Sequence, residues 1–388
     1  MSLKPVYIIP LLVEQPTWGG EYIAAFKGIV EPSITSKKIG QSFELAADSM
    51  ITSESNVPFA FATATDLKHP TYSRTPADLR SLQSLIDENP EAVLGKKTLE
   101  KFGPKMSTLI KFTQAQNNSY QVHVKPGKEF GKWKAKPESW YFLEPGKATL
   151  GLAPGISAEE YKARCLEIDQ FAQAQSAEVK AGKITLDTAK QNLHDFIEKD
   201  HPRRFVNTVN IAKDQVIDLS DGGIHHSWEM DSAVPNGNIV YEVQVDVQDE
   251  FCTLRSFDQG NMKGDGSVRP LTIEDYFKAL NTDPEANIPE NYQRELQHSQ
   301  VGSASVNELF STPNYQTICY EFSGELPKEI TTTSDSFHHI FVLEGEVEVK
   351  TEEKNYKVKK GWSLLVPAAA SHYAVFSDKP SKVFFTTS

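Results

Sequence analysis

Residues 214–225, DQVIDLSDGGIH, decide the fold because their layout recurs in residues 361–372, GWSLLVPAAASH. Each segment contains an apolar strand, a tight turn marked by Gly or Pro, and a second strand that opens with a histidine, His225 or His372. A strand pair that recurs within one chain indicates two domains of the same architecture.

A second repeated pair lies upstream, in ESWYFLEPG (138–146) and HHIFVLEG (338–345). These segments open with Glu138 and His338, and each leads through an apolar strand to a Leu-Glu turn. Most of the remaining chain alternates short apolar runs with Gly, Pro, Asn and Asp, which is typical of antiparallel sandwiches and barrels. We therefore expect a mainly β protein.

One block departs from this pattern and is helical. Ser157 and Glu160 form a capping box, and apolar residues then recur at helical spacing. A second helix is expected over 186–199, so residues 156–204 are predicted to be a helical insertion. Further helical patches are expected at 73–95 and at 272–297.

Composition excludes several classes of protein. The net charge of −12 over 388 residues argues against binding to nucleic acid or to an anionic membrane, since both require an excess of cations. The apolar run at 5–13 is broken by Pro10 and is too short to span a bilayer, so we expect it to be a first strand. The three cysteines are scattered, which favours a reducing compartment, the cytoplasm.

Two adjacent histidines, His225 and His226, follow the turn of the first repeat. Neighbouring side chains of a strand point to opposite faces, so only one of them can face the inside of a barrel. The alignment with His372 selects His225 as the inward residue.

The spacing that ends at His225 resembles the second sequence motif of the cupin superfamily, β-barrels that hold a metal in the mouth. This resemblance points upstream to Gln121 and His123, which share one strand face, and to Glu138. An amide oxygen, two imidazoles and a carboxylate would suit Zn²⁺ with open positions for water or substrate. The resemblance therefore implies one zinc ion per chain.

Several segments, in the same order, resemble the zinc-dependent type I mannose-6-phosphate isomerases, also called phosphomannose isomerases. The resemblance runs from about residue 5 to 275 and continues more weakly beyond. It rests on WGG (18–20), IGQSFELA (39–46), TLIKFTQAQNNSYQVHVKPG (108–127), KPESWYFLEPG (136–146), GGIHHSW (222–228), VYEVQ (240–244), Arg255 and RPL (269–271).

The implied fold is mainly β, with two cupin-type (jelly-roll) β-barrels and a helical insertion. The expected units are a catalytic barrel at 1–155 plus 205–270, the insertion at 156–204, a helical connection at 271–310, and a second, degenerate barrel at 311–388. His338 and His372 lack an accompanying Gln-x-His, so the second barrel is expected to be structural.

The implied activity is the interconversion of mannose 6-phosphate and fructose 6-phosphate through a zinc-stabilised cis-enediol. Lys136 is the implied acid/base, with a pKa that burial beside zinc would lower towards neutrality. Glu242 would assist sugar ring opening, and Arg255 would fork to substrate oxygens. The alternative for Arg255 is a strand arginine in a surface salt bridge.

The resemblance assigns substrate phosphate to Lys111 and Ser119, and Trp18 is expected in the cleft wall because Gly19 and Gly20 let the backbone approach closely. The alternative for Lys111 is a side chain that snorkels to solvent. The expected partner is a small sugar phosphate, with no nucleic acid and no membrane, and the expected state is a monomer or weak homodimer.

Four departures from the family pattern keep other functions open. Gln41 stands where the family has Glu, and Phe43 replaces Trp. The segment QVHVKPG lacks the proline that normally follows the ligand histidine, and the stretch from Glu242 to Arg255 is longer than usual. The alternatives are an isomerase or epimerase for another sugar or sugar phosphate, or a non-catalytic metal-bound sugar sensor.

Overall fold

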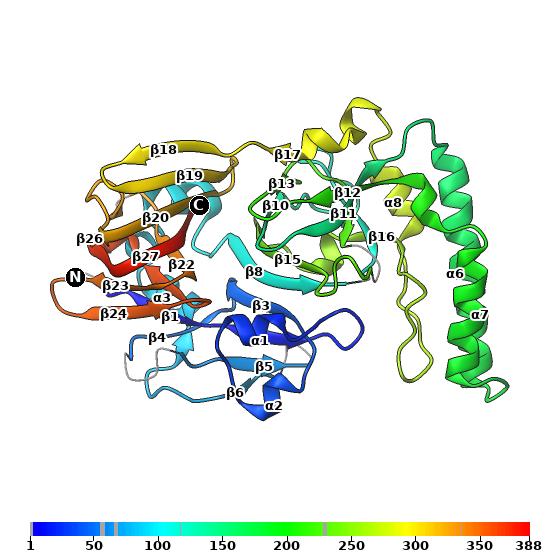
Figure 1. Cartoon of the computed structure of the whole chain (residues 1–388), viewed down its shortest axis with the longest axis horizontal. Helices are drawn as coiled ribbons and strands as arrows, with labels where there is room; N and C mark the ends of the chain where they lie inside the picture. The colour runs from blue at the N-terminus through cyan, green and yellow to red at the C-terminus, as the bar shows by residue number, and fades with distance from the viewer. Residues whose placement is uncertain (1–2, 55–58, 66–68, 117, 228–230, 334) are drawn as a thin grey trace.

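The computed structural model describes residues 3–54, 59–65, 69–116, 118–227, 231–333 and 335–388. Trp228, the last residue of the GGIHHSW segment, lies outside the described residues. The described chain is mainly β, as expected, with its long helices gathered at one end (Figure 1). None of the described helices has the length and apolarity that a membrane crossing requires.

The largest sheet of the described chain has eleven strands and is built mostly from the C-terminal part. Its strands are β18 (Gln297–Val301), β19 (Ala304–Ser311), β20 (Gln316–Glu325), β27 (Ala374–Thr387), β22 (His338–Glu344), β25 (Ser363–Val366), β1 (Val6–Ile9), β4 (Met50–Thr52), β7 (Arg80–Ser81), β23 (Glu346–Lys350) and β24 (Asn355–Lys359). Beside it, β21 (Thr332–Thr333) pairs with β26 (Ser371–His372).

Two further sheets carry the expected site residues. The first, of nine described strands, contains β17 (Gln293–Arg294), β13 (Val216–Asp218), β10 (Glu138–Phe142), β15 (Asn238–Val245), β8 (Thr108–Ala115), β3 (Ile39–Leu45), β2 (Leu11–Glu14), β5 (Ala62–Ala64) and β6 (Thr71–Tyr72). The second, of five, contains β12 (Val206–Ile211), β11 (Gly146–Leu152), β14 (Gly223–Ser227), β9 (Tyr120–His123) and β16 (Leu254–Phe257).

The internal repeat has a structural counterpart. In the first copy β10 pairs with β13 on one side and β15 on the other, and in the second copy β22 pairs with β25 and β27 in the same way. Within the described residues each of the three large sheets has two ends in its strand order, so closure into two barrels stays a prediction.

The first expected strand is in fact two. Pro10 has no N–H to donate to a ladder, and the chain turns there from β1 into β2. β1 pairs with β25 of the C-terminal sheet, whereas β2 pairs with β3 of the nine-stranded sheet. The expected domain boundaries therefore need correction, because the N-terminal segment contributes strands to both parts of the molecule.

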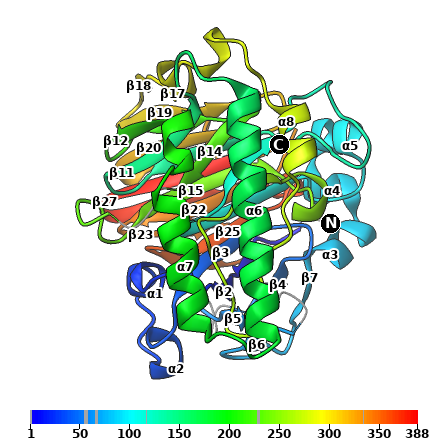
Figure 2. The ribbon, with the colours of Figure 1, turned by 90° about the vertical axis from the view of Figure 1, so that its right-hand side faces the viewer.

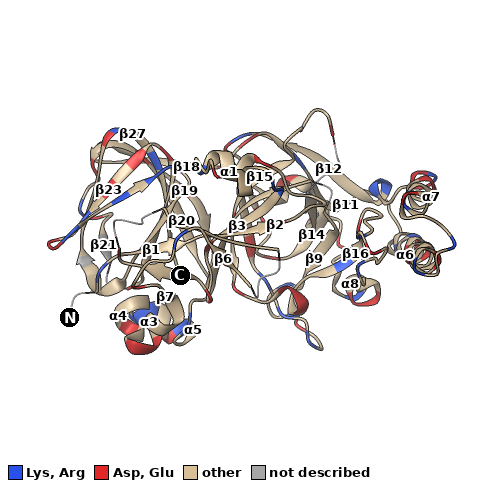
Figure 3. Cartoon of the chain, turned by 90° about the horizontal axis from the view of Figure 1, so that it is seen from below, with Lys and Arg blue, Asp and Glu red and all other residues tan. Residues whose placement is uncertain are grey.

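The helical insertion is confirmed. α6 (Ala158–Lys180) begins at Ser157, whose hydroxyl accepts the N–H of Glu160 at 3.2 Å, and α7 (Leu186–Glu198) returns beside it, before η1 (Pro202–Phe205). Phe171 and Phe196 stack between the two helices, with ring centroids 4.2 Å apart. Figure 2 shows the pair side by side in front of the sheets, and Figure 3 shows acidic and basic residues mixed along both helices.

The expected helical connection at 271–310 is mostly not helical. α8 (Ile273–Ala279) is followed by two short turns, η3 (Glu285–Asn287) and η4 (Pro289–Tyr292), and then by β17, β18 and β19. β18 is not predicted as a strand, because its sequence, QHSQV, is polar. Its residues are mostly exposed, and it lies at the end of the sheet. The other described helical segments are α1 (Tyr22–Phe26), α2 (Pro32–Thr35), α3 (Leu82–Glu88), α4 (Pro90–Leu94), α5 (Lys96–Phe102), η2 (Asp249–Phe251) and η5 (Ala368–Ala370).

A buried ion pair lies where the N-terminal segment meets the C-terminal sheet. Lys27, directly after α1, and Glu44, in β3, are both fully buried, with Nζ 2.6 Å from Oε1. Lys27 also donates to the carbonyl of Gly361, and Ser363 donates to the second carboxylate oxygen of Glu44 at 3.0 Å. His339 donates to the Glu44 carbonyl at 3.1 Å, so both charges have partners across the junction.

Removing one charge of this pair should be costly, because it leaves the other buried and uncompensated. We expect Lys27→Met to lower the free energy of unfolding by about 3–5 kcal/mol, measured by urea denaturation. The double variant Lys27→Met/Glu44→Leu should recover most of this loss, since it removes both charges.

The control is Lys96→Met, which removes an exposed lysine whose partner Glu100 lies 3.9 Å away. An exposed pair of this kind contributes about 0–1 kcal/mol. Equal effects of the two single variants would contradict the role assigned to the buried pair.

Candidate metal centre

Three buried side chains from two sheets converge on one point. His123 in β9 and His225 in β14 come from the five-stranded sheet, and Glu138 opens β10 of the nine-stranded sheet. One ligand atom of each lies within 4.8 Å of the others. Among the described residues, this is the only such group of three or more His, Cys, Asp or Glu side chains.

Backbone carbonyls fix the tautomers of both histidines. Nδ1 of His123 lies 2.7 Å from the carbonyl of Cys252, and Nδ1 of His225 lies 3.1 Å from that of Gly223. A carbonyl can only accept, so Nδ1 carries the proton and Nε2 keeps its lone pair. In metal sites, a hydrogen bond from the ring nitrogen that does not bind the ion orients the imidazole in this way.

The three residues fit a metal ion. Nε2 of His123 is buried, has no hydrogen-bond partner among the described residues, and lies 3.3 Å from Oε2 of Glu138. Burial lowers the pKa of both histidines, that of His225 to about 3, so both rings are neutral near pH 7. Two neutral imidazoles and a carboxylate are a typical ligand set of catalytic zinc.

Buried charges of alternating sign extend from this cluster along the nine-stranded sheet. Lys136 lies 2.6 Å from Oε2 of Glu138 and 4.0 Å from Oε1 of Glu242. Lys111, directly opposite Glu242 in the β8–β15 register, lies 2.7 Å from the same Oε1. The structure thus brings Lys111, Glu242, Lys136 and Glu138 into one network.

The lowered pKa expected for Lys136 beside zinc stays a prediction, since the neighbouring protein groups alone act in the opposite direction. Burial lowers the pKa, but the carboxylates of Glu138 and Glu242 outweigh it, so among the protein groups alone the pKa of Lys136 is raised. Burial also raises the pKa of Glu242, with repulsion from Glu138 adding to it. Glu138 itself stays ionised, because the ammonium of Lys136 lowers its pKa against the effect of burial.

Arg255 and Ser119 form a separate pair beside the cluster. Nε of Arg255 donates to the Ser119 hydroxyl at 3.1 Å, and Nη2 donates to Asp249 at 2.7 Å. In the strand register Gln121 lies directly opposite both Arg255 and His225, so these side chains share one face of the sheet. Gln121 is half-buried there.

Trp18 lies apart from these residues. It is half-buried, and a Cβ added to Gly40 would lie 2.6 Å from its ring, so the ring rests on the β3 backbone. Gly19 is needed for a close approach, since a Cβ there would meet the Gly40 nitrogen at 2.7 Å. Among the described residues, the backbone hydrogen bonds of Trp18 go to Gln15 and Gln116 and none joins it to the cluster.

His226 points to the other face of β14, as the strand period predicts. Its ring packs on Tyr120 with centroids 4.1 Å apart, and Gln259 donates to its Nε2 at 3.0 Å. His226 is fully buried, and these contacts are structural.

Two residues at the cluster were not expected from the sequence. Trp140, whose default interpretation is a core residue, donates its indole N–H to Oε1 of Glu138. Gln244 lies opposite Glu138 in the β10–β15 register, is buried, and has no described hydrogen-bond partner for its Oε1. The strand period of two could have indicated both residues. Trp140 lies two positions after Glu138, and Gln244 lies two positions after Glu242, so each shares a strand face with a predicted site residue.

The histidines of the C-terminal repeat are arranged differently. His338 contacts the hydroxyl of Tyr373 through Nδ1, and burial lowers its pKa to about 4. His372 is exposed, and neither residue belongs to a described cluster of metal-ligand type.

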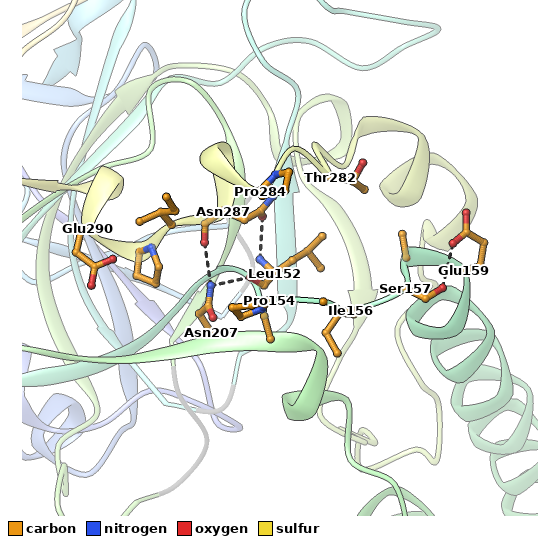
Figure 4. Close-up of a pocket in the computed structure, with 15 residues that line it drawn as sticks. Leu152, Pro154, Ile156, Ser157, Glu159, Asn207, Thr282, Pro284, Asn287 and Glu290 are labelled. Carbon is orange, nitrogen blue, oxygen red and sulfur yellow. Dashed lines mark hydrogen bonds between the residues drawn. The ribbon is translucent and has the colours of Figure 1, made fainter.

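A cavity of about 710 Å³ lies elsewhere, between the β11–α6 loop and residues 282–290 (Figure 4). The side-chain amides of Asn287 and Asn207, which line it, already bond to the backbone of Leu152. Asn287 accepts the N–H of Leu152 at 2.8 Å, and Asn207 donates to the Leu152 carbonyl at 2.7 Å. None of the three converging residues lines it, so this cavity is separate from the candidate metal site.

Comparison with known proteins gives one family and a consistent fold. Residues 323–379 match the family model of the mannose-6-phosphate isomerase cupin domain. No curated protein sequence matches the chain.

Solved structures match over the whole chain. The mannose 6-phosphate isomerase of Bacillus subtilis is 16% identical, with a TM-score of 0.67, and 100% of this chain and 99% of that chain are covered. A zinc-bound mannose 6-phosphate isomerase is 15% identical, with a TM-score of 0.63 and 99% of both chains covered. A variant phosphomannose isomerase of Salmonella typhimurium is 15% identical, with a TM-score of 0.64 and 99% of both chains covered.

At these identities the likeness to solved structures establishes the fold. The resemblance seen in the sequence is therefore confirmed: the chain has the fold of the mannose-6-phosphate isomerases along its length, with their cupin domain matched in its C-terminal part.

Proposed function

We propose that this chain is a zinc-dependent isomerase that interconverts mannose 6-phosphate and fructose 6-phosphate. The observation that carries the proposal is the buried cluster of His123, Glu138 and His225 with Lys136 beside it, inside the fold of these isomerases. Gln121, on the same sheet face as His225, is the proposed fourth ligand, and one ion per chain is proposed.

A bound zinc ion would supply Lewis-acid chemistry, polarising the sugar carbonyl and stabilising the oxyanion of a cis-enediol. The chain's own residues would bind the sugar and move the protons. Lys136 lies 2.6 Å from the ligand carboxylate and is our candidate for proton transfer between C1 and C2, while Glu242 is our candidate for ring opening.

Arg255 and Ser119 offer a fixed cation and a hydroxyl for substrate oxygens on the same sheet as the histidines. Trp18 would form part of a cleft wall. The three cysteines are free and buried, which fits a reducing compartment, so we place the enzyme in the cytoplasm.

One observation favours a second candidate, an isomerase or epimerase for another sugar or sugar phosphate. Lys111, assigned to phosphate, is buried and already neutralised by Glu242 at 2.7 Å. A substrate phosphate would have to compete with that carboxylate, whereas an unphosphorylated sugar would not.

A coupled assay tests the two candidates. Purified protein with zinc should interconvert mannose 6-phosphate and fructose 6-phosphate, lose this turnover with chelator, and regain it when zinc returns. Turnover of free mannose alone would favour the second candidate. Tight zinc binding without turnover of any of these sugars would indicate a sensor and contradict the proposed enzyme.

Substitution of the adjacent histidines tests the metal ligands. His225→Ala should lose bound zinc, measured by atomic absorption after dialysis, because it removes one ligand. His226→Ala should retain zinc, since that ring contacts Tyr120 and Gln259 on the opposite face. The reverse pattern would show that the strand register assigns the wrong histidine to the ion.

Lys136→Met tests the proton-transfer role. It should retain zinc but lower kcat by about 10²–10⁴-fold, the usual contribution of a general acid or base. Lys134→Met is the matched control, because Lys134 is exposed and two residues away along the chain. A wild-type kcat for Lys136→Met would exclude Lys136 as the acid/base.

A further inference from the structure

One side chain contacts two of the three converging residues. The indole N–H of Trp140 donates to Oε1 of Glu138. Its ring meets the imidazole of His225 edge-on, with centroids 5.3 Å apart and an interplanar angle of 82°. Trp140 thus contacts two proposed ligands, Glu138 and His225, that belong to different sheets.

We propose that Trp140 is the positioning residue of the metal centre, holding Glu138 so that a single carboxylate oxygen faces the ion. This inference rests on the proposed zinc site. It assigns a role to a residue that the strand pattern alone would place in the core.

The contacts of the carboxylate define which oxygen remains for the ion. Oε1 accepts the indole N–H, whereas Oε2 faces Nε2 of His123 at 3.3 Å and the ammonium of Lys136 at 2.6 Å. A hydrogen bond to one oxygen orients a carboxylate ligand and favours binding through the other. Binding through one oxygen leaves more of the zinc coordination sphere for substrate, since catalytic zinc keeps an open position.

The indole is itself held rigidly. Trp140 is only 6% exposed and packs in an apolar cluster with Phe142, Ile217 and Leu219. Its backbone is paired on both sides, with Ile217 of β13 and Glu242 of β15. A side chain fixed in this way can transmit its orientation to Glu138 and to the plane of the His225 ring.

Trp140→Phe separates this role from simple core filling, because phenylalanine keeps an aromatic ring but lacks the N–H. We expect zinc to bind about 10–100-fold more weakly, measured by competition with a chromogenic chelator, as for other outer-shell partners. The visible absorption of the cobalt-substituted protein should also change, since it reports ligand geometry directly. Neither measurement depends on turnover.

Trp362→Phe is the matched control. Its indole N–H donates to the carbonyl of Lys27 at 3.1 Å, and Trp362 is 2% exposed, so the variant loses a comparable buried hydrogen bond that involves none of the proposed zinc ligands. This variant should keep the wild-type zinc affinity and cobalt spectrum.

If Trp140→Phe does not fold, site-specific incorporation of 3-benzothienylalanine at position 140 replaces only the N–H by sulfur and keeps the ring shape. The same two measurements then apply, with the same expected changes.

Wild-type zinc affinity and an unchanged cobalt spectrum in the position-140 variant would overturn the proposal. Equal weakening in the Trp362→Phe control would also overturn it, because the effect would then be general. If the wild-type protein binds no zinc, the proposal is also overturned, because Glu138 is then not a metal ligand that Trp140 could position. A wild-type protein that binds zinc without isomerising sugar phosphates would refute the proposed function, while the affinity of the variant still decides the role of Trp140.

Discussion

The arrangement of the site follows from one constraint, the negative charge of Glu138 in a place that solvent does not reach. An isolated carboxylate there would be strongly unfavourable, so it needs compensating groups. Lys136 supplies an opposite charge at 2.6 Å, and Trp140 supplies a hydrogen bond. These contacts keep Glu138 ionised beside two neutral imidazoles, which is the state that a divalent cation requires of its ligands.

The molecule contains a second buried carboxylate with a different outcome. Glu44 lies in β3 of the nine-stranded sheet that also contains β10, but its oxygens are taken by Lys27, Ser42 and Ser363. Around Glu138, by contrast, Nε2 of His123 keeps a lone pair without a hydrogen-bond partner among the described residues. Complete satisfaction makes the first group a structural tie between sheets, and incomplete satisfaction marks the second as a place for a ligand.

The sequence was informative where chemistry is local. The capping box at Ser157 located the start of α6, and the period of two separated His225 from His226. It was less informative where partners are distant along the chain. Nothing near Pro10 in the sequence indicates that β1 pairs with β25. The polar segment QHSQV does not predict a strand by itself, because its strand structure depends on pairing with β19. The opposition of Lys111 and Glu242 likewise depends on a register between strands, which local composition does not contain.

The pairing of Val6 with Leu365 also affects how the chain folds, because the two residues lie far apart in the sequence. β1 pairs with the nearby β4 on one edge, whereas its other edge pairs with β25, a strand far away in the sequence. An unpaired strand edge can template pairing with another molecule. Contacts this distant in sequence also slow folding. Until β25 pairs with it, β1 therefore keeps an unpaired edge that is exposed to intermolecular pairing during folding.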